Sequence, residues 1–134
     1  MGTSANRAII QRYVEPWSTG DLTAFDETVG ESYLLHPDGT LDDLRKAVQE
    51  ARGGFPDLAI TIEDSIAEDD KVAYRWTMRG THQGEIEGIA PTGKDVEVTG
   101  ITIVRVEDGK VVEDWFESGS PSLEEQLGPA VPPH

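Results

Sequence analysis

The chain has 134 residues, of which 26 are acidic and 11 basic, giving a net charge of −15, and it contains no cysteine. A negative field of this size repels nucleic-acid phosphates and anionic lipid, so neither nucleic acid nor a membrane is an expected partner. The lack of cysteine excludes disulfides and thiolate chemistry, and no apolar run approaches the roughly 20 residues of a membrane span. We therefore expect one acidic, cytoplasmic domain over residues 1–134, with a flexible tail at 129–134.

A first helix is predicted over residues 5–17, where apolar side chains recur three or four positions apart and end with Trp17. Ser4 is a suitable N-cap, because its hydroxyl can accept a hydrogen bond from a free backbone N–H of the first turn. Pro16 has no N–H to bond to the carbonyl of Arg12. We therefore expect the helix to kink or end there.

Two further helices are predicted before the strands begin. Apolar residues spaced along one face predict a short helix over residues 21–29, which Gly30 is expected to end. A short extended segment follows, and then Thr40 begins a third helix that continues to Ala51. Asp43, three residues after Thr40, is in the position that completes a capping box.

The rest of the chain is rich in β-branched and aromatic residues, separated by turn residues. Four strands are predicted, at 58–64, 72–80, 96–107 and 110–117. The pair Asp108-Gly109 supplies the positive φ angles of a tight hairpin between the last two strands. Residues 82–95 form a long irregular connection, and Ser122 with Glu125 predicts a short helix that ends at Gly128. Helices followed by antiparallel strands indicate an α+β fold in which the helices cover one face of a curved sheet and leave a pocket.

Two partial motifs do not support a ligand site. Residues 88–94 match the first seven positions of a phosphate-binding loop, but Asp95 stands where a serine or threonine would bind magnesium, and a strand follows instead of a helix. His82 and Glu85 lie close together in the sequence, yet without the spacing of metal ligands on a helix. We therefore predict no metal and no phosphate cofactor.

Several runs of the sequence resemble the SnoaL-like polyketide (ester) cyclase family, which belongs to the nuclear-transport-factor-like superfamily. The runs are RWTMRGTH at 75–82, GIAPTG at 88–93, GITIVR at 100–105, EDGK at 107–110 and Trp115. The resemblance extends over nearly the whole chain. It implies a cone-shaped α+β barrel with an apolar pocket, and a cyclase reaction on a polyketide ester that needs no cofactor. It also implies a homodimer formed sheet to sheet, with Trp115 on the outer face.

The resemblance also assigns roles to two positions on the last strands. Phe116 matches the aspartate that acts as general acid and base in the characterised cyclases, and Thr102 matches a histidine on the preceding strand. If Phe116 points into the pocket, the alternation of side chains along a strand sends Asp114 to the same side. A carboxylate desolvated there would have a raised pKa and is the candidate base. The alternative is a solvated Asp114 at the rim, or a strand register shifted by a β-bulge.

Other side chains are candidates for the pocket. His36, in a Tyr-x-x-His-Pro segment, is the second catalytic candidate, since an imidazole can donate to a developing enolate; alternatively it bonds to its own turn. Trp17, Tyr74 and Trp76 are expected to form the pocket wall or to be ordinary core residues. His82 is expected on the loop over the open end, where it could control access.

Two functions remain open from the sequence. The first is an enzyme that uses Asp114 or His36 for acid–base chemistry on a hydrophobic carbonyl compound, in a cyclase or isomerase reaction. The second is a binding module of the same fold that holds an apolar small molecule without chemistry. A hydrolase of the limonene-epoxide type is disfavoured, because no inward Arg and Asp two residues apart are evident on the strands.

Overall fold

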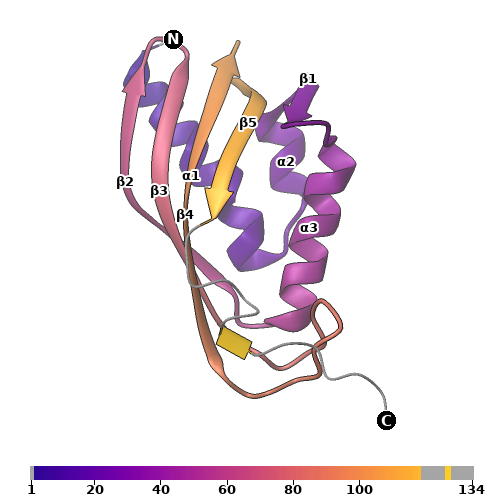
Figure 1. Cartoon of the computed structure of the whole chain (residues 1–134). Coiled ribbons are helices and arrows are strands. Elements are labelled where there is room, and N and C mark those ends of the chain that lie inside the picture. Colours follow the sequence, from indigo (N-terminus) through magenta and orange to yellow (C-terminus); the bar gives the residue numbers. More distant parts are fainter. Residues whose placement is uncertain (1, 119–125, 128–134) are drawn as a thin grey trace.

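The computed structural model describes residues 2–118 and 126–127. Three helices lie against one face of a curved five-stranded sheet (Figure 1). The elements in chain order are α1 (Thr3–Thr19), α2 (Thr23–Thr28), β1 (Val29–Leu35), α3 (Leu41–Gly54), β2 (Ala59–Glu68), β3 (Lys71–Thr81), β4 (Asp95–Glu107) and β5 (Lys110–Ser118).

The sheet has the strand order β1-β5-β4-β3-β2. Strands β2 to β5 are antiparallel neighbours, whereas β1 pairs with β5 in parallel. The predicted α+β class, with helices on one face of a mostly antiparallel sheet, is confirmed. The sheet does not close into a complete barrel, because β1 and β2 remain its two edges.

The first helix is longer than predicted at both ends. It begins after Gly2, so the prediction of Ser4 as N-cap was wrong, and Ser4 lies inside the first turn. It also continues past Pro16 to Thr19. A proline removes only one backbone hydrogen bond, and the ring of Pro16 is buried against the core. The helix ends at Gly20, which has φ of 78° and donates its N–H to the carbonyl of Pro16 at 2.8 Å.

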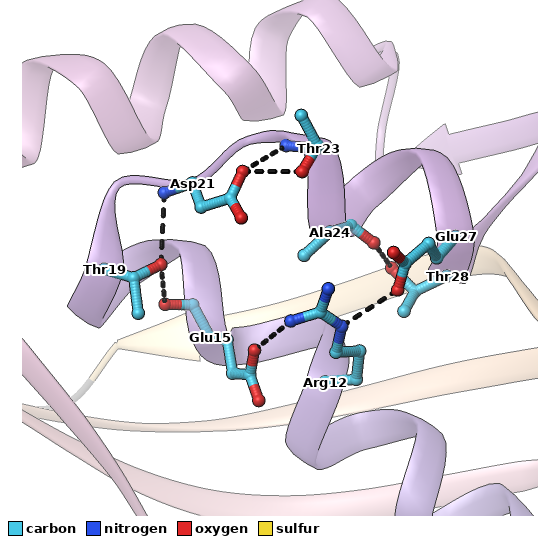
Figure 2. Close-up of polar contacts among 8 residues, drawn as sticks. All are labelled: Arg12, Glu15, Thr19, Asp21, Thr23, Ala24, Glu27 and Thr28. Atoms are coloured by element: carbon cyan, nitrogen blue, oxygen red, sulfur yellow. Dashed lines mark hydrogen bonds and ion pairs between the residues drawn. The ribbon is translucent and has the colours of Figure 1, made fainter.

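Polar side chains fix the connection from α1 to α2, as Figure 2 shows. The backbone N–H of Asp21 donates to the hydroxyl of Thr19 at 3.1 Å. The Asp21 carboxylate then accepts from the N–H and the hydroxyl of Thr23, at 3.1 and 2.6 Å. Across the two helices, Arg12 Nε donates to Glu27 at 3.0 Å. These contacts tie α2 to α1, and Phe25 of α2 packs edge-on against Tyr13 of α1.

The other boundaries follow from turn and cap residues. Residue 29 already belongs to β1 and Gly30 lies within that strand, so the predicted end of the second helix at Gly30 was wrong. The capping box at the start of α3 is confirmed, with Thr40 Oγ1 accepting from the Asp43 N–H at 3.3 Å and Asp43 accepting from the Thr40 N–H at 2.7 Å. The Asp108-Gly109 hairpin is confirmed too, with φ of 51° and 76°.

The connection between β3 and β4 is irregular, as predicted, and its one isolated bridge within the described part of the chain joins Ile86 and Ile89. Of the predicted helix at 122–128, Gln126 and Leu127 are described and are helical. The predicted cap residues Ser122 and Glu125, and the tail at 129–134, lie outside the described residues.

The buried side chains form two clusters. The larger one joins α1, α2 and α3 to the middle of the sheet, and the smaller one contains Phe55, Leu58, Ile89, Val96 and Leu127. Trp17, Met78 and Val98 contact both clusters. Within the described residues, no helix combines the length and the apolar character that crossing a membrane requires.

Candidate active site

A cavity of about 550 Å³ lies between the helices and the sheet. Most of its wall is apolar, and the polar side chains that line it include Asp114, Tyr13, Tyr74 and Thr102. The apolar wall is made by Val14, Trp17, Leu35, Leu44, Ala47, Ala51, Phe55, Leu58, Ile60, Trp76, Met78, Ile86, Val96, Val98 and Phe116. The volume and the apolar wall suit a small hydrophobic molecule.

Asp114 brings a carboxylate to this wall from the middle of β5. It is 5% exposed, so the prediction that it points inward agrees with its position, and the alternative of a solvated rim residue does not. Its Oδ2 accepts a hydrogen bond from the Tyr13 hydroxyl at 2.6 Å. Its Oδ1 is buried without a hydrogen-bond partner among the described residues.

Burial raises the pKa of Asp114 to about 6, because removing a carboxylate from water penalises its charged form. The hydrogen bond from Tyr13 and the nearby charge of His36 oppose this rise, since both stabilise the carboxylate. A carboxylate with a pKa near neutrality can take up and release a proton under physiological conditions.

Two tyrosines beside Asp114 were not predicted as site residues. Tyr13 of α1 donates to Asp114, and the hydroxyls of Tyr13 and Tyr33 lie 2.6 Å apart. A signal for Tyr13 was present, because it lies four residues before Trp17 and therefore on the same helix face. Tyr33 becomes a neighbour only because β1 pairs in parallel with β5, which the local sequence does not reveal.

Trp76 and Thr102 form a second polar contact in the wall. The indole Nε1 donates to Thr102 Oγ1 at 2.9 Å, and both residues are buried. The indole lies across β4 at Gly100, the register partner of Trp76. A Cβ at Gly100 would come within 2.3 Å of the indole ring, so this wall requires glycine there.

His36 does not lie at the cavity. Its Nε2 is 2.8 Å from a Glu113 carboxylate oxygen, and its ring stacks on Trp115 with a centroid distance of 4.4 Å and an interplanar angle of 10°. The reason is the strand alternation: Leu35 lines the cavity opposite Asp114, so the next side chain points to the outer face. The structure therefore does not bring the two predicted catalytic residues into one cavity.

His82 also lies elsewhere than predicted. It is fully buried, whereas we expected it on the loop over the open end of the cavity. Its Nδ1 accepts from the Thr92 N–H at 3.2 Å, and its backbone bonds to Gly93 and Lys94. His82 therefore anchors the base of the loop at residues 82–94 and is not among the residues that line the cavity.

The remaining predicted residues line the cavity. Trp17, Tyr74, Trp76 and Thr102 contribute to its wall, and Phe116, which is 51% exposed, lies at its edge with the solvent. The structure thus groups these side chains around Asp114. The described residues contain no group of three or more His, Asp or Glu arranged to hold a metal ion.

The chain is thus an α+β protein with a helix layer on a curved sheet and one buried carboxylate in an apolar cavity. The sequence matches the SnoaL-like polyketide cyclase family over residues 7–127. The chain belongs to this family, as the resemblance noted in its sequence indicated.

Solved structures agree with this assignment. AclR from Streptomyces galilaeus, named as a candidate hydroxylase, is 32% identical, with 98% of this chain and 91% of that chain covered and a TM-score of 0.86. TsrD from Streptomyces laurentii is 26% identical over 96% and 98% of the two chains, with a TM-score of 0.86. IdmH from Streptomyces antibioticus, named as a candidate polyketide cyclase, is 31% identical over 91% and 97%, with a TM-score of 0.80. A comparison with curated proteins gave no match.

Proposed function

We propose that the protein is an acid–base enzyme that acts on a hydrophobic carbonyl compound held in the cavity, with Asp114 as the base. The observation that carries this proposal is the buried carboxylate in the apolar wall, whose pKa is raised to about 6. The names of the similar cyclases support a carbonyl substrate.

In the proposed reaction, Asp114 removes a proton from the carbon beside a carbonyl group. The electron pair of the broken C–H bond forms an enolate, and neutral donors in the wall, such as the Tyr74 hydroxyl, are available to stabilise its oxygen. The enolate carbon then attacks a second carbonyl of the same molecule and closes a ring, and the new alkoxide takes the proton back from Asp114. In an isomerase, the proton returns to a different carbon instead.

The test compares Asp114→Asn with Glu113→Gln, which changes the neighbouring carboxylate on the opposite face of β5. Hydrophobic ketones and β-keto esters are incubated with each protein in D₂O, and exchange of the proton beside the carbonyl is followed by NMR. We expect exchange with the wild type and with Glu113→Gln, and a loss of about 100-fold or more with Asp114→Asn. Exchange should increase as the pH rises through about 6. Unchanged exchange in Asp114→Asn would refute the role of Asp114.

The alternative is a binding module without chemistry, and it is favoured because His36, the second predicted catalytic residue, does not reach the cavity. Because His36 lies on the outer face, Asp114 is the one buried titratable carboxylate or imidazole among the described residues that line the cavity. This alternative would be favoured if compounds bind tightly but the proton beside their carbonyl group exchanges no faster with the protein than in buffer alone.

We also propose that two copies of the chain associate through the outer face of the sheet. Ile66, Ala73, Ile103 and Trp115 are register partners across β2, β3, β4 and β5 and form an apolar row on that face. Ile66 and Ile103 are 72% and 41% exposed, and such a row supports contact with a second copy.

A further inference from the structure

Three side chains from distant parts of the sequence form a line of hydrogen bonds that begins in the cavity wall. The Tyr33 hydroxyl of β1 lies 2.6 Å from the Tyr13 hydroxyl of α1, and the Tyr13 hydroxyl lies 2.6 Å from Asp114 Oδ2 of β5. Tyr13 is 3% exposed, and its ring packs edge-on against Phe25 with a centroid distance of 5.9 Å. The line is therefore held by packing as well as by hydrogen bonds.

The direction of each hydrogen bond follows from the chemistry of the groups. Burial is the main cause that raises the pKa of Tyr13 and of Tyr33, so both hydroxyls keep their protons. An ionised carboxylate accepts only, and each tyrosine has one proton to donate. Tyr13 therefore donates to Asp114, and Tyr33 donates to the oxygen of Tyr13.

The line of hydrogen bonds makes the two oxygens of Asp114 different. Oδ2 is occupied by a charge-assisted hydrogen bond, which is about twice as strong as a neutral one. Oδ1 has no partner among the described residues and is itself buried, so in this orientation it is closed off from the cavity. A bond at Oδ2 restricts rotation of the carboxylate about its last torsion, so Oδ1 is held in one orientation.

We propose that Tyr13, held by Tyr33, is a positioning residue that fixes the orientation of the Asp114 carboxylate in the cavity wall. This inference rests on the proposed function of Asp114 as the base. It adds the two side chains that hold the carboxylate in place.

The same hydrogen bond also affects the basicity of Asp114. Two other groups act electrostatically with this carboxylate: Tyr74 of β3, in the cavity wall, and His36 just after β1, whose charge acts from the outer face. Thr102 of β4 lies in the same wall. Of these and Tyr13, the structure records a hydrogen bond to Asp114 from Tyr13 alone among the described residues. Removing the Tyr13 hydroxyl leaves burial less opposed, so the pKa of Asp114 should rise.

The decisive experiment measures the titration of Asp114 directly and needs no substrate. The protein is labelled with ¹³C at the carboxyl carbons of aspartate, and the Asp114 signal is assigned by its loss in Asp114→Asn. We expect Tyr13→Phe to raise the pKa of Asp114 by about one unit, since a hydrogen bond to a charged group is lost. Tyr33→Phe keeps the bond to Asp114 and should cause a smaller rise.

Tyr74→Phe is the matched control, because it removes a hydroxyl from the same wall without removing a hydrogen bond to Asp114. It should change the pKa of Asp114 less than Tyr13→Phe does. Amide spectra of each variant check that the fold is retained. If Tyr13→Phe does not fold, the smaller rise in Tyr33→Phe remains the test of the inference.

Exchange rates in D₂O give the second measurement. In Tyr13→Phe, the midpoint of the pH profile should move up by the same amount as the titration of Asp114, and the rate above that midpoint should fall about tenfold because the carboxylate is free to rotate. An unchanged pKa and an unchanged pH profile in Tyr13→Phe would overturn the positioning role, whatever Asp114→Asn does. Unchanged exchange in Asp114→Asn would overturn the proposed function without altering the titration result.

Discussion

The burial of Asp114 in the cavity wall lowers the stability of the folded protein when its carboxylate is charged. Its usual pKa of 3.8 is raised to about 6 in the folded protein, mainly by burial. The folded state therefore binds more protons than the unfolded state between about pH 4 and pH 6. In that window the free energy of unfolding falls as the pH rises, and above it the full cost of about 3 kcal/mol is present.

We predict that Asp114→Asn stabilises the protein at about pH 8 by up to about 3 kcal/mol, and that this gain disappears near pH 4, where Asp114 is protonated. The asparagine side chain is neutral at every pH and can still accept from Tyr13. Urea unfolding at several pH values measures the effect. A gain that is the same at pH 4 and pH 8 would contradict the raised pKa.

Glu113→Gln is the control, because its pKa shift has the opposite sign. Arg105, and to a smaller extent His36, lower the pKa of Glu113 below its usual value. Its contribution to stability is therefore present above the usual carboxyl pKa and is lost as the pH falls through the lower folded value. Replacing it should not stabilise the protein at high pH.

At the residue scale, the alternation of side chains along β5 was enough to predict that Asp114 and Phe116 share the cavity side. The same rule applied to β1 would have placed His36 correctly, since Tyr33 and Leu35 face inward and the next residue must face outward. The error came from using the Tyr-x-x-His-Pro pattern in place of the alternation. The link between Tyr13 and Asp114 joins positions 101 residues apart, and no local pattern reveals it.

At the scale of the elements, the hairpin between β4 and β5 sets which side chains of β5 face the cavity. A slip of one residue would turn Asp114 to the outer face. The turn depends on Gly109, whose φ of 76° is in the left-handed region that a side chain disfavours. Its sequence signal, Asp-Gly between two apolar runs, is purely local, which explains why it was predicted correctly.

We predict that Gly109→Ala destabilises the protein by about 1 to 2 kcal/mol, the cost of placing a Cβ in the left-handed region. Gly53→Ala is the matched control, because Gly53 is an exposed residue of α3 and a Cβ there meets nothing within 4 Å. That change should be neutral or should stabilise by up to about 1 kcal/mol. Urea midpoints of the two variants measure the contrast, and equal effects would contradict the role of the turn.

The ends of elements were less predictable than their existence. Pro16 indicated that α1 should kink or end there, but the helix continues to Thr19, because its buried face outweighs one missing hydrogen bond. Val29 was expected at the end of the second helix, but it pairs with Val111 and is therefore extended as the first residue of β1. Both outcomes depend on tertiary contacts that a local pattern does not contain.

At the scale of the whole molecule, the sequence predicted the helix layer and the antiparallel strands, but not the place of β1. This strand joins the sheet beside β5 although more than 70 residues separate them, so its partner is set by the global fold. The consequence reaches the site, because β1 brings Tyr33 and Leu35 to Asp114. The net charge of −15 bears instead on association, since two copies of the chain repel each other.

We predict a homodimer at micromolar concentrations, formed through the apolar row on the outer face, with an affinity that increases with salt as the repulsion is screened. Ile103→Glu places a carboxylate in the middle of the row and should give monomers. Gln11→Glu, which adds the same charge on an exposed position of α1, should leave the dimer intact. Light scattering after size exclusion distinguishes the two masses. A monomeric wild type at high salt, or a dimer that Ile103→Glu does not weaken, would show that this face is not the contact.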